Sequence, residues 1–139
     1  MGRTARCACG RLSVTAEGEP SIVLVCHCTE CQRRTGAPFG VGAYFPKEKV
    51  AVSGESKLFT RPGGDGRKMF NRFCPECGTT VYWESELLPG AYGIALGAFA
   101  DPGFPPPARS VWEEKKHAWV HLGPEIPGHV QGRASKASR

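Results

Sequence analysis

Seven cysteines, gathered in three short clusters, constrain this chain more than any other feature. The central cluster, Cys26-His27-Cys28-Thr29-Glu30-Cys31, places three thiols within six residues. Two pairs flank it, Cys7-Ala8-Cys9 upstream and Cys74-Pro75-Glu76-Cys77 downstream, and these clusters contain every cysteine of the 139 residues. Such close spacing is typical of metal ligands. An odd number of cysteines also leaves one thiol unpaired in any complete disulfide scheme.

The composition indicates a mainly β domain. The chain contains 18 Gly and 12 Pro, which favour turns and short strands over long helices. Its length suits one domain, which we expect over residues 1–127. We expect residues 128–139 to be a basic, disordered tail, because this end is polar and has no periodicity. Residues 1–6 are expected to be a frayed basic leader.

Location and partners follow from what the sequence lacks. No run approaches the ~18 apolar residues of a membrane span, and the N-terminus lacks the apolar core of a secretory signal. We therefore expect a cytoplasmic protein with no membrane partner, in which cysteines are more often metal ligands than disulfides. A formal net charge of +5 is too small to predict nucleic-acid binding by itself. The sequence leaves the oligomeric state open.

Short apolar and alternating segments predict where the strands lie. Residues 11–16 alternate between apolar and polar side chains, and residues 22–25 form a buried strand that leads into Cys26. A helical turn is expected from Gln32, ended by Gly36 and Pro38. Further strands are expected over residues 41–45, 50–52, 56–60, 79–83 and 92–97. The loop over residues 61–68 is rich in glycine and positive charge but lacks the spacing of a nucleotide-binding P-loop.

The cysteines divide into a group of four and a group of three. Cys74 and Cys77, followed by Gly78, have the form of a metal knuckle, and Cys7 with Cys9 can complete its four ligands, since positions i and i+2 of an extended chain face the same way. Structural zinc takes four protein ligands, whereas catalytic zinc takes three and keeps one position open. The remaining trio is Cys26, Cys28 and Cys31. We therefore expect two zinc ions per chain, one structural and one catalytic.

Other assignments of these cysteines stay open at this point. The chain could hold one four-cysteine site plus three incidental thiols. Both sites could instead be structural, with His27, Glu30 or another side chain as the eighth ligand. His27 stands between two cysteines that should face the same way, so its side chain is expected to point elsewhere. The other histidines, His117, His121 and His129, have no ligand spacing and are expected at the surface.

These motifs resemble the glutathione-dependent formaldehyde-activating enzyme family, also called the centromere-protein-V-like family. The resemblance covers about residues 5–120 and depends on residues 7–10, 26–31, 34–39 and 73–78. It implies a β-tent fold, built of several small antiparallel coiled sheets around a structural zinc site. It also implies a structural role for Cys7, Cys9, Cys74 and Cys77 and a catalytic role for Cys26, Cys28 and Cys31.

The implied activity is that of a zinc-dependent carbon–sulfur lyase. Its substrate would be a small thiol or a thiol–aldehyde adduct such as S-hydroxymethylglutathione. Phe39 could help to exclude water, and five arginines could hold the carboxylates of an anionic thiol: Arg33, Arg34, Arg61, Arg67 and Arg72. The chain departs from the family in its last third, where residues 97–102, 110–112 and 118–119 differ from the usual motifs.

Parts of the sequence also agree with two other functional classes. One is a non-catalytic, zinc-stabilised binding module for protein or nucleic acid, which the basic residues Arg133, Lys136 and Arg139 would support. The other is a methionine sulfoxide reductase of the B type. That chemistry needs a nucleophilic cysteine outside the zinc site, and none remains once all seven are assigned.

Overall fold

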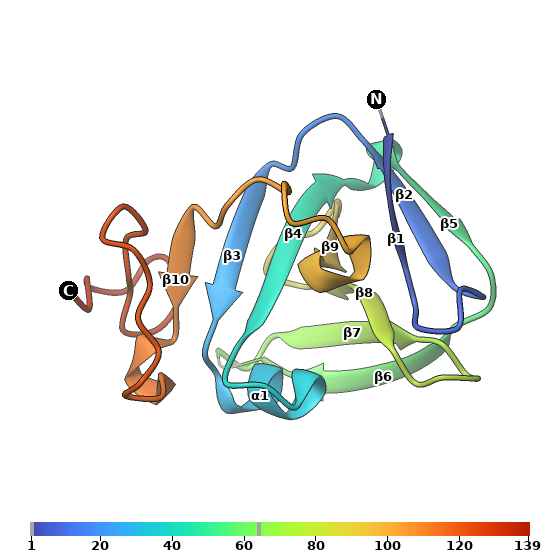
Figure 1. The fold of residues 1–139 in the computed structure, drawn as a ribbon. Coiled ribbons are helices and arrows are strands. Elements are labelled where there is room, and N and C mark those ends of the chain that lie inside the picture. The colour runs from blue at the N-terminus through green and yellow to red at the C-terminus, as the bar shows by residue number, and fades with distance from the viewer. Residues whose placement is uncertain (1, 64) are drawn as a thin grey trace. The chain divides into compact units, whose positions relative to one another are not determined.

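The protein, described as a computed structural model over residues 2–63 and 65–139, is mainly β. Figure 1 labels its strands and its α-helix. The chain divides into two compact units. The first unit consists of Met1–Ser21 and Ala43–Phe104, and the second of Ile22–Gly42 and Pro105–Arg139. No helix in the described part of the chain is long and apolar enough to cross a membrane.

A three-stranded antiparallel sheet opens the first unit. Its strands are β1 (Gly2–Arg6), β2 (Ser13–Glu17) and β5 (Val50–Ser53), in the order β1-β2-β5. The expectation of a frayed leader over residues 1–6 is wrong for Gly2–Arg6. Ala5 is fully buried, and the hydroxyls of Thr4 and Thr15 lie 3.0 Å apart across the β1–β2 pair. Alternate burial and strand pairing thus order the N-terminal segment.

Four more strands of the first unit form an antiparallel run. They are β6 (Lys57–Pro62), β7 (Lys68–Phe73), β8 (Thr80–Ser85) and β9 (Ala91–Ala95), each paired with the next. The short 3-10 helices η1 (Lys47–Lys49) and η2 (Leu96–Phe99) follow β4 and β9. Phe45, Val81 and Ile94 are fully buried in the core of this unit. Gly64, within the loop predicted over residues 61–68, lies outside the described residues.

The second unit contains the helix α1 (Thr29–Thr35) and a parallel pair of strands, β3 (Ile22–Cys26) and β10 (Arg109–Val111). The antiparallel expectation does not extend to this pair, because a long connection brings β10 beside β3 in the same direction. Its register sets Val111 opposite Cys26. The 3-10 helix η3 (Glu113–Lys115) follows β10, and β4 (Gly40–Pro46) leads the chain into the first unit.

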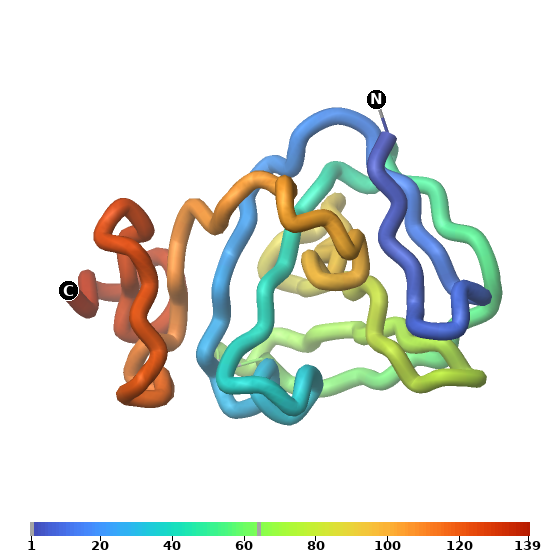
Figure 2. The backbone as a smooth tube through the Cα atoms, viewed as in Figure 1, coloured from blue at the N-terminus to red at the C-terminus, as the bar shows by residue number. Residues whose placement is uncertain are grey.

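The C-terminal segment is folded back within the second unit, beside β10 (Figure 2). Gly128 bridges Ser110, and the Ser138 N–H donates to the Gly128 carbonyl at 3.0 Å. Residues 128–139 were expected to be disordered, whereas the structure holds this segment with bridges and backbone hydrogen bonds. The reason is tertiary, because Arg139 forms an ion pair with the buried Glu113, and local composition cannot reveal such a partner.

The prediction of a mainly β fold is confirmed, although one sheet is antiparallel and the other, which contains the parallel β3–β10 pair, is mixed. Each predicted strand falls within two or three residues of a strand in the structure, because the alternation of apolar side chains marks the buried face. The expectation of one domain over residues 1–127 stays a prediction.

Candidate metal centres and an adjoining pocket

Four cysteine sulfurs come together in the first unit. The Sγ atoms of this four-cysteine group lie within 4.8 Å of one another, and its members are Cys7, Cys9, Cys74 and Cys77. Two of these residues are buried and two are exposed, so the group lies at the edge of the core. It joins the turn after β1 to the turn between β7 and β8.

The spacing of these sulfurs fits a tetrahedral metal ion. Cys9 Sγ lies 3.6 Å from both Cys7 Sγ and Cys74 Sγ. A disulfide needs about 2.05 Å, and all four thiols are free. Four sulfurs at about 2.3 Å from a zinc ion would be about 3.8 Å apart. The donor set and spacing therefore fit zinc.

Turns, rather than extended chain, position the four sulfurs. We expected Cys7 and Cys9 to alternate along a strand, but β1 ends at Arg6 and both lie in the following turn. Gly10 and Gly78 follow the two pairs with φ of 81° and 79°. A side chain at such a φ is strained, so glycine suits both positions. The Leu12 N–H donates to Cys7 Sγ at 3.2 Å.

Thiol acidity within this group depends on its neighbours. Hydrogen bonds from Thr79, whose Oγ1 lies 3.3 Å from Cys77 Sγ, lower the pKa of Cys77 to about 5. For Cys9 the backbone bond of Arg11 lowers the pKa, but burial and the adjacent sulfurs outweigh it and raise the pKa to about 11. Crowded thiols cannot all ionise without a compensating cation, and a divalent metal ion supplies that charge.

The second unit holds a group of three. Cys26, Cys28 and Cys31 have Sγ atoms within 4.8 Å of one another, and no His, Asp or Glu joins them among the residues that the structure describes. Cys26 ends β3, and Cys28 is the N-cap of α1, where its Sγ accepts from the Cys31 N–H at 3.3 Å. The helix thus begins at Thr29, three residues before the expected helical turn, and Cys31 lies inside it.

Hydrogen bonds among the three thiols, together with burial, control thiol ionisation in the three-cysteine group. Hydrogen bonds to Cys28 and Cys31, together with burial, raise the pKa of Cys26. For Cys31, the bond to Cys26 lowers the pKa, yet Cys28 and burial raise it on balance. The positive charge of Arg34 partly offsets this rise. Three half-buried thiols that suppress one another's ionisation have the donor chemistry of a metal site, because a cation removes the repulsion.

His27 points away from the three sulfurs, as expected from its place between two cysteines. Its side chain is fully buried, and its Nε2 lies 2.9 Å from the hydroxyl oxygen of Ser110. Its Nδ1 is buried without a hydrogen-bond partner among the described residues. Burial is the largest influence on the imidazole and lowers its pKa. The possibility of His27 as an additional ligand is therefore not supported by this geometry.

The candidate arginines separate into different surroundings. Arg34 borders the three-cysteine group, since a Cβ added at Gly40 would meet both its guanidinium and the Cys31 Cβ. Arg33 is exposed and forms an ion pair with Glu30 at 2.8 Å. Arg61 is buried in the first unit, where its Nη1 donates to the Pro62 carbonyl. The first unit also contains Arg67 and Arg72.

Sequence reasoning missed the partners of His27. Ser110 and Glu113 are buried and hydrogen-bonded to each other. Neither residue belongs to a sequence motif that predicts this contact. The remaining histidines lie in the second unit. His117 and His121 are exposed as expected, whereas His129 is half-buried and its Nδ1 lies 3.3 Å from the Ser135 carbonyl oxygen.

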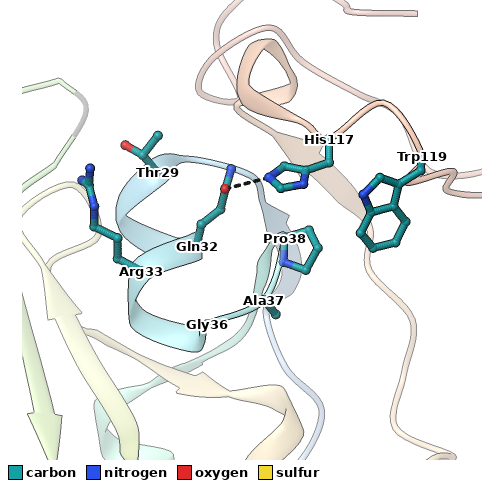
Figure 3. Close-up of a pocket in the computed structure, with 8 residues that line it drawn as sticks. All are labelled: Thr29, Gln32, Arg33, Gly36, Ala37, Pro38, His117 and Trp119. Carbon is teal, nitrogen blue, oxygen red and sulfur yellow. Dashed lines mark hydrogen bonds between the residues drawn. The ribbon is translucent and has the colours of Figure 1, made fainter.

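A pocket of about 440 Å³ lies beside α1 (Figure 3). It is lined by Thr29, Gln32, Arg33, Gly36, Ala37, Pro38, His117 and Trp119. His117 Nε2 lies 3.0 Å from Gln32 Oε1, and the indole of Trp119 is 66% exposed. Cys31 follows Thr29 by two residues, so the two lie roughly 160° apart around the helix. Cys31 therefore lies on a different face of α1 from Thr29 of the pocket.

Comparisons with known proteins place the chain in a family. The model of the glutathione-dependent formaldehyde-activating enzyme family matches residues 2–120. A crystal structure of a Rhodobacter sphaeroides protein has a similar fold, with a TM-score of 0.55, 22% sequence identity, and coverage of 74% of this chain and 91% of that chain. No curated protein matches significantly. With the family motifs intact over most of its length, the chain belongs to the glutathione-dependent formaldehyde-activating enzyme family.

Proposed function

We propose that the protein is a zinc-dependent enzyme of the carbon–sulfur lyase type, which acts on a thiol–aldehyde adduct such as S-hydroxymethylglutathione. One observation carries this proposal. Three cysteine sulfurs converge at the start of α1, and no fourth His, Cys, Asp or Glu joins them among the described residues. A group with three protein ligands leaves a coordination position for substrate, which is the arrangement of catalytic zinc sites.

The residues present fit zinc at both groups. Cys26, Cys28 and Cys31 would hold the catalytic ion, and Cys7, Cys9, Cys74 and Cys77 the structural ion. Zinc bound at the three-cysteine group would favour the thiolate form of a substrate thiol and polarise an aldehyde oxygen. The four-cysteine group fills a closed site, so its role is to link two turns of a small domain.

Side chains around the three-cysteine group would bind and shield the substrate. Arg34 is half-buried, lies beside Cys31 and offers a guanidinium to a substrate carboxylate. Phe39 is also half-buried, and its ring centroid lies 5.8 Å from that of His27. A role for this ring in reducing the access of water to the adduct stays a prediction, because the contact that the structure gives is with His27.

The reaction is balanced without a redox partner. In the direction of adduct formation, the thiol sulfur bonds to the aldehyde carbon and the proton lost from the thiol ends on the carbonyl oxygen. The reverse direction breaks the same carbon–sulfur bond and releases thiol and aldehyde. We further propose a cytoplasmic location, which the seven free cysteines support because that compartment keeps thiols reduced.

The test compares Cys28→Ser with Thr29→Ala, which alters the next residue on the pocket face of α1. We expect Cys28→Ser to lose one zinc ion per chain. Its rate of catalysed adduct exchange should be at least 100-fold lower than that of the wild type. Thr29→Ala should keep both ions and the exchange rate. Exchange between ¹³C-formaldehyde and glutathione can be followed by NMR, and zinc by elemental analysis. Full zinc content and unchanged exchange in Cys28→Ser would refute the proposal.

The alternative of a non-catalytic binding module draws less support from the geometry. Its best sequence evidence was the basic tail, but Arg139 is engaged with Glu113 and the Ile126 carbonyl. Salt-sensitive DNA binding by the wild-type chain, together with no acceleration of adduct exchange, would favour the module.

A further inference from the structure

A buried hydrogen-bonded chain leads away from the three-cysteine group. It begins at His27, the residue between Cys26 and Cys28, and its imidazole Nε2 lies 2.9 Å from Ser110 Oγ. Ser110 Oγ in turn donates to Glu113 Oε2 at 2.6 Å. Both His27 and Ser110 are fully buried, and Glu113 is 9% exposed. These polar groups are thus removed from water, where each depends on its protein partners.

The chemistry of the acceptor fixes the direction of this chain. An ionised carboxylate can only accept, so the Ser110 hydroxyl hydrogen points to Glu113. The Ser110 oxygen must then accept from His27, which makes Nε2–H the donor. The Glu113 carboxylate therefore orients the imidazole through the serine, as carboxylates orient histidines in the outer shells of metal sites.

C-terminal residues hold the Glu113 end of this hydrogen-bonded series. The Arg139 Nε–H donates to both carboxylate oxygens of Glu113, at 3.1 and 3.3 Å, and its Nη2 donates to the Ile126 carbonyl at 2.6 Å. Ser138 Oγ also donates to Glu113 Oε1. The backbone N–H of Glu113 donates to the His129 carbonyl at 3.0 Å. The carboxylate is thus held in place by several donors.

Strained backbone accompanies this arrangement. Trp112, between the β10 residue Val111 and Glu113, has a φ of 58°. This left-handed conformation is costly for a bulky side chain and persists only when the surroundings enforce it. Hydrogen bonds from the Trp112 N–H to the Gln131 carbonyl and from the Lys115 N–H to the Trp112 carbonyl hold it there. The turn allows Ser110 and Glu113, three residues apart, to meet.

At the other end of the series, both polar backbone groups of His27 are hydrogen-bonded. The His27 N–H donates to the Val111 carbonyl at 3.1 Å, which extends the β3–β10 pair by one residue. The His27 carbonyl accepts from Gln32 Nε2 at 2.8 Å. His27 is bonded through its two peptide groups to Cys26 and Cys28. An imidazole locked by Ser110 therefore restricts the backbone that carries two of the three sulfurs.

We propose that Ser110, Glu113 and Arg139 form a positioning network that acts through His27 to hold the three cysteines in their metal-binding arrangement. This inference depends on the proposed function, in which that group holds zinc. The network makes the last residues of the chain part of the support of the metal centre. The four-cysteine group belongs to the first unit and serves as an internal control.

The experiment measures metal retention in the full-length chain. Wild type, Ser110→Ala and Glu113→Gln are loaded with two equivalents of Co²⁺, and release to a coloured chelator is followed together with the thiolate-to-cobalt charge-transfer band. We expect the ion of the three-cysteine group to leave 10- to 100-fold faster in both variants, with an altered band. The second ion should leave at the wild-type rate. Glu114→Gln, an exposed neighbour bonded to Gln131, is the matched control.

Each outcome decides the proposal. Release rates and spectra within twofold of the wild type in both variants would overturn it. Faster loss of both ions, with or without unfolding, would also overturn it, because the network would then support the fold as a whole rather than one site. If the wild type binds only the ion of the four-cysteine group, the proposed function fails first. Binding of both ions with unaltered variants refutes only the network.

Discussion

Replacing Glu113 with glutamine should destabilise the protein in a pH-dependent way. Burial by itself raises the pKa of this carboxyl, but hydrogen bonds from Ser110, Ser138 and Arg139 lower it from 4.5 to about 2. Each pKa unit is worth about 1.4 kcal/mol, so the ionised carboxylate contributes about 3 kcal/mol to the free energy of unfolding at pH 7. Glutamine keeps the shape and loses the charge.

The pH dependence has a definite sign. Because the pKa is lower in the folded state, this contribution is complete above about pH 5 and disappears as the pH falls from 4.5 to 2. Urea unfolding followed by tryptophan fluorescence gives the free energy of wild type and Glu113→Gln at each pH. The pH range in which the two free energies converge, between 4.5 and 2, identifies the contribution of the Glu113 charge.

Glu114→Gln again provides the control, and its exposed carboxylate should be worth less than about 0.5 kcal/mol. A loss of less than 1 kcal/mol at pH 7 in Glu113→Gln would contradict the proposed arrangement. So would a difference from the wild type that stays constant down to pH 3, because a charge-dependent contribution must fade there.

Three further predictions concern the metal groups and the strained backbone. Removal of metal by a strong chelator should lower the melting temperature by more than 10 °C, and a melting curve that does not move would exclude a structural ion in the four-cysteine group. Gly40→Ala should displace the Arg34 guanidinium and raise KM for glutathione about tenfold, with little loss of stability. Gly97→Ala is the control, because a Cβ there meets nothing within 4 Å, and it should leave KM unchanged. Ala100 has a φ of 50°, so Ala100→Asn should stabilise the protein by about 0.5–1 kcal/mol in urea unfolding, and a loss of stability would show that this conformation is not strained.

Local pattern was sufficient to predict most strands and the division of the cysteines into two groups. The alternation in Ser13–Glu17 follows from the pleat of a half-buried strand, so Val14 and Ala16 are inside. Cysteines two or three residues apart can reach one ion whatever the rest of the chain does, and the structure brings together the same groups of four and three. Gly78, which follows Cys77 in the same local motif, has a φ of 79° that glycine adopts without strain.

Contacts between distant segments decided what local pattern could not. Gly2–Arg6 is ordered by pairing with β2, although its composition resembles a frayed end. Cys28 caps a helix because the chain turns after β3, and this turn sets Cys31 on a different face of α1 from Thr29 of the pocket.

The sequence by itself determined that this protein offers two sets of thiols to metal, because ligand spacing is a property of the chain. Only the tertiary structure decided how the three-cysteine group is supported. Ser110, Glu113 and Arg139 are separated from His27 by more than 80 residues, yet in the folded chain they form a hydrogen-bonded series that ends at its imidazole. The sequence around a buried carboxylate does not predict its hydrogen-bond partners, because folding brings those partners from distant segments of the chain.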